Sequence, residues 1–245
     1  MIFSVKSAFA PLFIDDERVD EVLHGMSVKA EEENGEYLRI LTAYRYSGWL
    51  HRSHLCAVTE RSGETKYINT AAADVLAAPK VQAALLICLT LGCTVQTLAS
   101  NKNGWTHVRL ADGRCGYIRS SFLSDFPKEV TRKALVKAAM LYQGAQYRWG
   151  GKTPMGIDCS GMVFMAYWLN GVAIYRDARI SPGFPIKKIP ADAAREGDLL
   201  FFPGHVGILF DKDTMLHSSE AGNGVKLESL TDEWQSRITA AGSIF

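Results

Sequence analysis

One cysteine and two histidines stand at positions whose spacing suits covalent chemistry. Cys159 follows Asp158 at the head of an apolar stretch, and His205 and His217 follow in two strand-like segments. A thiol attacks a carbonyl carbon only as the thiolate, so a cysteine nucleophile needs a base within reach, and histidine commonly serves as that base. These three residues predict a cysteine nucleophile that is activated by a histidine.

The stretch after Asp158 has the pattern of an α-helix. Asp158 is a good N-cap, Asn170-Gly171 is a good stop, and apolar residues recur between them at helical spacing, namely Met162, Val163, Ala166 and Leu169. Cys159 then lies in the first turn, where the helix dipole favours a negative sulfur and thiol pKa values fall to roughly 3.5 to 7.5. Burial opposes that shift, and a buried structural cysteine is the alternative interpretation of this stretch alone.

The two histidines are predicted to lie in one β-hairpin, in the strands on either side of the loop 211–213. With three residues in the loop, Gly207 faces His217, and His205 then lies diagonally beside His217 on the same face of the sheet. A two-residue loop would place the two rings on opposite faces, so their interaction depends on the register.

Five segments resemble the successive motifs of the NlpC-type cell-wall peptidases, in the same order and at similar spacing. They are Tyr147-Arg148-Trp149-Gly150-Gly151, Asp158-Cys159-Ser160-Gly161-Met162-Val163, Gly197-Asp198-Leu199-Leu200-Phe201-Phe202, His205-Val206-Gly207-Ile208 and His217-Ser218-Ser219. The resemblance covers about residues 128 to 235. It implies a papain-like α+β catalytic domain, in which a helix that carries the cysteine packs on an antiparallel sheet that carries the histidines.

The resemblance also implies catalytic roles. Cys159 is the nucleophile that attacks an amide carbonyl, and His205 is the base that takes its proton and later protonates the leaving amine. His217 holds His205 in the correct tautomer and orientation. Tyr147 assists the backbone N–H of Cys159 in stabilising the oxyanion, or is a packing aromatic.

Substrate-binding roles follow from the same resemblance. Asp158 and Ser160 contact the substrate as well as capping the helix, although capping alone is the simpler interpretation. Asp177 binds the free amine of the substrate or is a solvated loop charge, and Trp149 lines the cleft or packs beneath it.

The residues before this segment contain an internal repeat of about 68 residues. The segments Tyr37-Leu38-Arg39-Ile40, Gly48-Trp49-Leu50 and Leu55 align without gaps to Trp105-Thr106-His107-Val108, Gly116-Tyr117-Ile118 and Leu123. Short alternating strands with glycine turns indicate two small β-barrels, which resemble bacterial SH3-like domains. The predicted domains are thus a first barrel over 1–63, a second barrel over 64–126, and the peptidase domain over 127–245, which begins with a helix over Lys128 to Tyr142.

The resemblance assigns one further substrate contact to the first barrel. In relatives with this architecture a first-barrel tyrosine reaches the peptidase cleft, which implies a substrate-binding role for Tyr46. Met26 departs from the pattern, because an acidic residue is expected near that position.

Composition excludes several classes of partner. The 245 residues carry 27 basic and 26 acidic side chains, a net charge of +1, so no nucleic-acid partner is expected. No apolar run approaches the roughly 20 residues that span a bilayer, so no membrane partner is expected. Lys6 and Pro11 stand where a secretory core would lie, so we expect a cytoplasmic protein, or an extracytoplasmic one if a leader has been removed.

The chain has five cysteines, an odd number. The four in the repeats, Cys56, Cys88, Cys93 and Cys115, have no paired Cys-x-x-Cys spacing and read as small buried hydrophobic residues. A zinc site formed by Cys159, His205 and His217 is the main alternative chemistry, and it would need a fourth ligand or a water. The predicted reaction needs no metal or other cofactor.

Together these features predict a cysteine endopeptidase whose partners are peptidoglycan stem peptides (muropeptides). The resemblance implies that it cleaves the γ-D-glutamyl-L-diamino-acid bond, in peptides with a free N-terminal L-Ala during murein peptide recycling. Three alternatives remain: a remodelling hydrolase that acts on intact peptidoglycan, an acyltransferase with the same fold, and a non-catalytic wall-binding protein.

Overall fold

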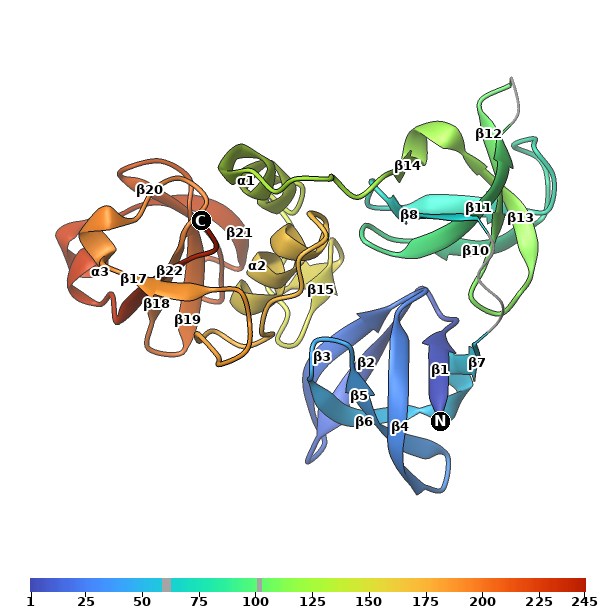
Figure 1. The fold of residues 1–245 in the computed structure, drawn as a ribbon, viewed down its shortest axis with the longest axis horizontal. Helices are drawn as coiled ribbons and strands as arrows, with labels where there is room; N and C mark the ends of the chain where they lie inside the picture. The colour runs from blue at the N-terminus through green and yellow to red at the C-terminus, as the bar shows by residue number, and fades with distance from the viewer. Residues whose placement is uncertain (59–62, 101–102) are drawn as a thin grey trace. The chain divides into compact units, whose positions relative to one another are not determined.

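The chain forms two compact units, Met1–Phe126 and Pro127–Phe245. The computed structural model describes residues 1–58, 63–100 and 103–245 (Figure 1). None of the helices formed by these residues is long and apolar enough to cross a membrane. The finer division of the first unit into 1–63 and 64–126 stays a prediction.

The first unit consists of two antiparallel sheets of seven strands each. The first sheet has the order β3-β2-β6-β5-β4-β1-β7 and the second the order β10-β9-β13-β12-β11-β8-β14, so β8 to β14 take the places of β1 to β7. The predicted internal repeat is therefore confirmed in the strand order. The strands of the first sheet are β1 (Ile2–Val5), β2 (Phe9–Ile14), β3 (Glu17–Leu23), β4 (Ser27–Asn34), β5 (Tyr37–Thr42), β6 (Ser47–His51) and β7 (Leu55–Ala57). Those of the second are β8 (Glu64–Ile68), β9 (Ala73–Leu76), β10 (Leu85–Leu89), β11 (Thr94–Ser100), β12 (Trp105–Arg109), β13 (Cys115–Arg119) and β14 (Leu123–Ser124).

The predicted β-barrels are wrong. In each sheet the pairings of the described residues run in one open line, from β3 to β7 and from β10 to β14, and none of them joins the two edges. The last strand of each repeat is short and follows a 3-10 turn, Arg52–His54 or Ser120–Phe122. Among the described residues it pairs only with the first strand of its repeat. Alternation and turn residues predict strands well, but they carry no information on whether the edge strands of a sheet meet.

The second unit is built on one six-stranded antiparallel sheet with the order β17-β22-β18-β19-β20-β21. Its strands are β17 (Lys187–Ile189), β18 (Leu199–Phe202), β19 (His205–Leu209), β20 (Thr214–Ser219), β21 (Gly224–Ser229) and β22 (Ala240–Ser243), with a 3-10 turn at Ala191–Ala193. A separate two-stranded ribbon, β15 (Lys152–Thr153) and β16 (Gly156–Ile157), precedes the central helix. The helices are α1 (Arg132–Met140), α2 (Cys159–Trp168) and α3 (Asp232–Ser236).

The α+β, papain-like fold class is also wrong, because strands dominate the described residues and the helices are few and short. The helix expected over Lys128 to Tyr142 forms only from Arg132 to Met140, where the Thr131 side chain caps its N-terminus. Between α2 and β18 the chain forms one short strand and a 3-10 turn but no α-helix. The sequence pattern thus predicted a longer first helix than the second unit has.

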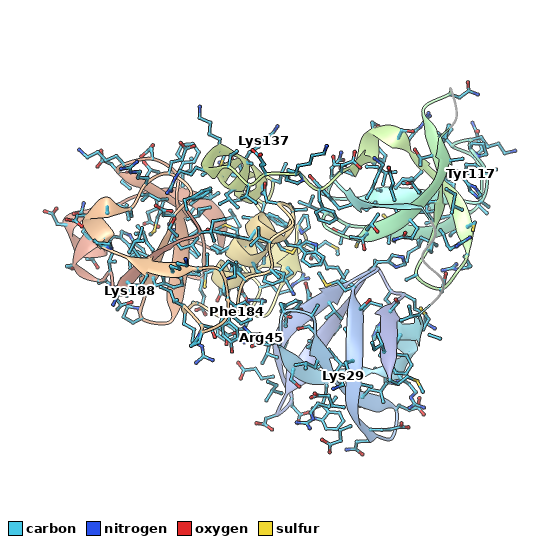
Figure 2. The ribbon with its side chains drawn as sticks, viewed as in Figure 1. Lys29, Arg45, Tyr117, Lys137, Phe184 and Lys188 are labelled. Atoms are coloured by element: carbon cyan, nitrogen blue, oxygen red, sulfur yellow. The ribbon has the colours of Figure 1, made fainter. Side chains whose placement is uncertain are left out.

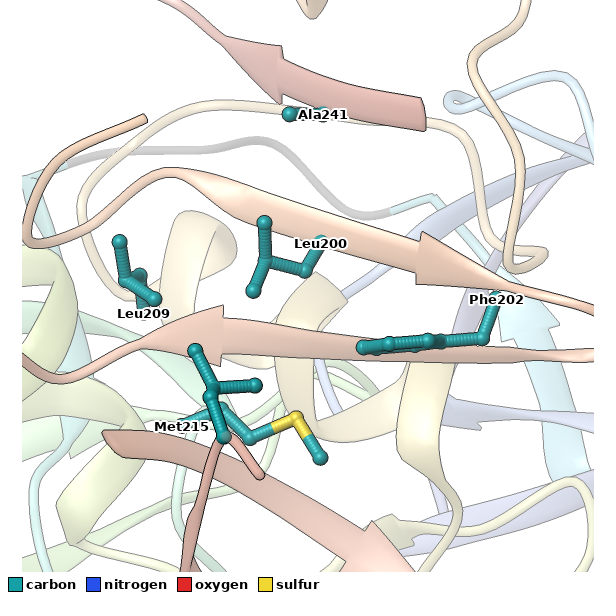
Figure 3. Packing of buried hydrophobic residues seen from close by; sticks show 6 residues of the cluster. Leu200, Phe202, Leu209, Met215 and Ala241 are labelled. Carbon is teal, nitrogen blue, oxygen red and sulfur yellow. The ribbon is translucent and has the colours of Figure 1, made fainter. Parts of the chain in front are cut away.

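The two faces of the six-stranded sheet pack differently. One face carries a cluster of buried side chains, Leu200, Phe202, Leu209, Met215, Leu230 and Ala241, five of which are labelled in Figure 3. Trp234 of α3 packs against this cluster. Helix α2 contacts β19 and β20 and is buried on almost every side, as expected for a helix that is apolar all round. This packing holds the cysteine at the head of α2 in a fixed place in the unit.

Candidate active site

Cys159 is the first residue of α2, and its position depends on the cap of that helix. The Asp158 carboxylate accepts a hydrogen bond of 2.6 Å from the backbone N–H of Gly161, as the sequence predicted for an N-cap. Only glycine fits at position 161, because a Cβ there would collide with the carbonyl oxygen of Gly151. The Asp-Cys-Ser-Gly motif therefore encodes a capped helix start pressed against the preceding loop, with the thiol at its tip.

A buried arginine holds this helix start from the other side. Arg176, whose side chain is 1% exposed, donates to both carboxylate oxygens of Asp158 at 3.0 and 2.9 Å. It also donates to the Ser160 hydroxyl at 2.7 Å and to the Gly151 carbonyl at 3.3 Å. The fork of the guanidinium matches the carboxylate in a bidentate pair, a geometry that lysine cannot reproduce. The substrate-binding role predicted for Asp158 stays a prediction, and its hydrogen bonds give it a positioning role.

Replacing Arg176 with methionine is expected to lower the free energy of unfolding by about 3 to 5 kcal/mol, because it leaves the buried Asp158 carboxylate without its charge partner. The measurement is chemical denaturation of the full chain, followed through the unfolding of the second unit. Arg195→Met is the matched control, since Arg195 is exposed, and it should change stability by less than about 0.5 kcal/mol. A loss below about 1 kcal/mol for Arg176→Met would mean that the pair does not support the helix start.

The expected lowering of the thiol pKa does not occur. Burial, and then the charge of Asp158, raise the pKa of Cys159 to about 11, although the backbone N–H groups of Val206 and Ser160 and the charge of Arg176 act in the opposite direction. The side chain of Cys159 is buried, so the desolvation of a thiolate outweighs the favourable helix dipole. Cys159 therefore rests as the neutral thiol, and its reactivity depends on a base that removes the proton.

His205 is the first residue of β19, and its imidazole is neutral at neutral pH. Its neighbour Val206 donates its backbone N–H to the Cys159 sulfur, which places the start of β19 against the head of α2. Burial, followed by the charges of His217 and Arg237, lowers the pKa of His205 to about 4. The ring is therefore unprotonated at neutral pH and has a lone pair available for a proton.

His205 and His217 contact each other directly. The His205 Nε2 and His217 Nδ1 atoms lie 2.8 Å apart, and the two ring planes are nearly perpendicular at 81°. The pairs Ile208↔Leu216 and Leu209↔Met215 show the register that the three-residue loop predicted, which puts both rings on one face. Gly207, which lies beside His217, has little room for a side chain, because a Cβ there would lie 3.1 Å from the Met215 sulfur. The predicted hairpin geometry is confirmed.

Sequence analysis did not predict Glu228 as part of this site. Its Oε2 atom lies 2.8 Å from His217 Nε2 and 2.9 Å from Lys226 Nζ. Glu228 lies on β21, where Lys226 is the register partner of His217, so the carboxylate reaches the ring diagonally. The only sequence signal is the alternation of Lys226 and Glu228, which places the two charges on one face of a strand.

Trp234 of α3 is a second residue that the sequence did not indicate. Its ring centroid lies 6.0 Å from that of His205 and 5.5 Å from that of His217. The indole therefore covers both imidazoles on the side of the apolar cluster and shields their hydrogen bond from water.

The predicted substrate-binding residues lie in different surroundings. Burial, and then the charges of Cys159 and Asp158, raise the pKa of Tyr147, so its phenol stays protonated near the thiol. Trp149 is 56% exposed. Tyr46 belongs to the first unit, where it precedes β6, and its role at the site stays a prediction.

A small hollow of about 10 Å³, room for about one water molecule, lies beside the start of α2. Ser160, Asp177 and Val206 line it, so it brings two of the predicted substrate-binding residues together. Apolar walls come from α2, the sheet and the loop before β17, and the Phe184 side chain of that loop is labelled in Figure 2. The hollow combines apolar walls with a carboxylate and a hydroxyl.

Among residues 1–58, 63–100 and 103–245, no group of three or more His, Cys, Asp or Glu side chains is arranged to hold a metal ion. The two ring nitrogens of His217 are both engaged, one with His205 and one with Glu228. His205, His217 and Glu228 thus form a line of hydrogen-bonded side chains.

The chain is similar to proteins of one known family. A model of the NlpC/P60 family matches residues 144–243. The dipeptidyl-peptidase 6 of Lysinibacillus sphaericus is 40% identical over 267 residues, covering 100% of this chain and 98% of that relative. The γ-D-glutamyl-L-lysine dipeptidyl-peptidase of Bacillus subtilis strain 168 is 28% identical, covering 86% of this chain and 76% of that relative.

The crystal structure of an NlpC/P60 family protein from Bacillus cereus ATCC 10987 superposes with a TM-score of 0.86 at 17% identity, over 98% of each chain. Its likeness shows a shared fold over both units. The predicted resemblance to the NlpC-type peptidases is confirmed by the family model and by the full-length relative. The chain belongs to the NlpC/P60 family.

Proposed function

We propose that this protein is a cysteine peptidase that hydrolyses the γ-D-glutamyl-L-diamino-acid bond of peptidoglycan stem peptides, with a preference for peptides that have a free N-terminal L-Ala. The observation that carries the proposal is the hydrogen-bonded pair His205 and His217, held by β19 and β20 beside the buried thiol of Cys159. Two relatives support the bond and the substrate end, since one is named a dipeptidyl-peptidase and the other a γ-D-glutamyl-L-lysine dipeptidyl-peptidase.

The reaction begins with a proton transfer. The Nδ1 atom of His205 takes the proton of the Cys159 thiol as the sulfur attacks the amide carbonyl carbon, so that thiolate and imidazolium form only when substrate is bound. This order follows from the two pKa values, about 11 for the thiol and about 4 for the imidazole. In the free enzyme Cys159 and His205 are therefore both neutral.

The oxyanion of the tetrahedral intermediate needs hydrogen-bond donors. The backbone N–H of Cys159 is among the first of α2, which have no partner within the helix, and the protonated Tyr147 phenol is the second donor. His205 then returns the proton to the leaving amine, which leaves a thioester on Cys159. Water attacks the thioester with His205 as base, and the γ-glutamyl carboxylate is released.

In this proposal the dipeptide on the amino-terminal side of the cleaved bond binds at the surface around Ser160 and Asp177, which line the hollow beside α2. Ser160 and Asp177 supply polar contacts there, and the Asp177 carboxylate binds the charged amine of L-Ala. A glycan attached to that amine would remove its charge. The enzyme therefore acts on released peptides, and we assign it to murein peptide recycling in the cytoplasm, which cell fractionation followed by immunoblotting tests.

Acetylation of the substrate amine is expected to lower kcat/KM by at least about tenfold, because a lost charge-assisted hydrogen bond costs roughly 1.5 to 3 kcal/mol. The measurement compares L-Ala-γ-D-Glu-diaminopimelate with its N-acetyl form, with products identified by mass spectrometry. Asp177→Asn should reduce this discrimination, since it removes the charge that binds the amine.

The same assay separates the alternatives. Equal rates on the free and acetylated peptides, or efficient digestion of intact sacculi, would indicate a wall-remodelling hydrolase. Transfer of the dipeptide to an added amine in place of water would indicate an acyltransferase. Binding of the peptide without any product would contradict the proposed peptidase.

A further inference from the structure

Glu228 extends the line of catalytic side chains by one residue. Its Oε2 atom lies 2.8 Å from His217 Nε2, and His217 Nδ1 lies 2.8 Å from His205 Nε2. Burial alone would raise the pKa of the Glu228 carboxyl, but the hydrogen bonds from Lys226 and His217 and their charges outweigh it and hold the pKa below its usual value. At neutral pH Glu228 is therefore a carboxylate and can only accept hydrogen bonds.

The ionised carboxylate determines where the ring protons lie. Burial lowers the pKa of His217, so that ring carries a single proton, and Glu228 can accept it only from Nε2. The Nδ1 atom of His217 is then an acceptor, so the single proton of neutral His205 must lie on Nε2. The Nδ1 atom of His205 is left with a lone pair, the form that can take a proton from Cys159.

We propose that Glu228 is a positioning residue that fixes the tautomers of both histidines and stabilises the imidazolium that forms on His205. The proposal rests on the thiol and imidazole chemistry proposed above. Glu228 does not touch the substrate or the thiol and acts only through His217. Its contact with Lys226 balances part of its charge on the outer face of β21.

Because residue 217 is a histidine, which has two neutral tautomers, the site needs a residue that selects one of them. With the proton on Nδ1, His217 would donate to His205 Nε2 and force the proton of His205 onto Nδ1, facing the thiol. That pair of tautomers keeps the hydrogen bond but cannot accept a proton from Cys159. A carboxylate at Nε2 of His217 excludes it, because an unprotonated Nε2 would face the carboxylate with no hydrogen between them.

The test is Glu228→Gln in the full chain. An amide can turn either its oxygen or its NH2 group toward His217, so both tautomers become possible and the negative charge is lost. We expect kcat on L-Ala-γ-D-Glu-diaminopimelate to fall by about 10- to 100-fold, and KM to change by less than about threefold. Glu233→Gln makes the same chemical change at an exposed position of α3 and should leave both constants within about twofold of the wild type.

Two further measurements separate positioning from a merely structural role. The ¹⁵N signals of the histidine rings should show the proton on Nε2 of both residues in the wild type, and a mixture of tautomers in Glu228→Gln. In a His217→Asn background, which has no ring tautomers, Glu228→Gln should cost less than about twofold in kcat.

The outcomes are distinct from those of the proposed function. The ring signals need no turnover, so Nε2 protonation that depends on Glu228 would support the proposal even if the peptide is not a substrate. Wild-type ring signals and wild-type kcat in Glu228→Gln would overturn it. A large loss of kcat that persists unchanged in the His217→Asn background would also overturn it, since Glu228 would then act by another route.

Discussion

Replacing Cys159 with alanine is expected to abolish hydrolysis while the second unit stays folded. The sulfur is the atom that would form the acyl-enzyme, and removal of a covalent nucleophile costs more than about 10⁴-fold in kcat. Cys159 is buried at the tip of a capped helix, and alanine occupies nearly the same space without the polar Sγ atom. The cap and the pair between Asp158 and Arg176 do not involve the thiol, so they persist in the variant.

The measurement is the release of dipeptide followed by mass spectrometry, with circular dichroism as the test of folding. Cys88→Ala is the control and should keep full activity. The prediction that Cys88 is buried is wrong, because it is an exposed cysteine on β10 of the first unit. Retention of more than about 1% of the wild-type rate by Cys159→Ala would sink the assignment of the nucleophile.

His205→Ala is expected to reduce kcat by about 10³-fold or more, while His217→Asn retains measurable activity. With a thiol pKa near 11 and a buried sulfur, the fraction of thiolate available without a base is very small, so loss of His205 removes the proposed acceptor for its proton. His217 acts on His205 through one hydrogen bond, and the asparagine side-chain oxygen can accept that bond.

Steady-state kinetics on the same peptide give both values. His107→Ala, in the first unit, controls for the loss of a histidine away from the site. Complete loss of activity in both His205→Ala and His217→Asn, together with stoichiometric zinc in the purified wild type, would contradict these roles and favour a metal site.

Local features of the second unit were predictable because they depend on short stretches of chain. Asp158 as N-cap and the glycine after Asn170 mark the two ends of α2, and the structure has the helix from Cys159 to Trp168. The loop of three residues between β19 and β20 determines the register that joins His205 to His217. Both inferences need only neighbours along the chain or across one hairpin.

Features that depend on distant segments were not predictable in this way. Glu228 reaches His217 only because β21 pairs with β20, and Arg176 reaches Asp158 from a loop with no regular pattern. The pKa of the Cys159 thiol is raised and not lowered, because burial is a property of the whole unit. The same limit explains why strand patterns suggested barrels where the sheets are open.

The buried, un-ionised state of Cys159 has a consequence for the protein's exposure to oxidants. Peroxides attack the thiolate, and oxidation to sulfenic acid follows thiolate character and access to solvent. Burial raises the pKa of Cys159 to about 11, so little of the thiol is ionised at pH 7, and the residue is 5% exposed. The burial that would make a nucleophilic Cys159 depend on a base thus also limits its reaction with peroxides in the free protein.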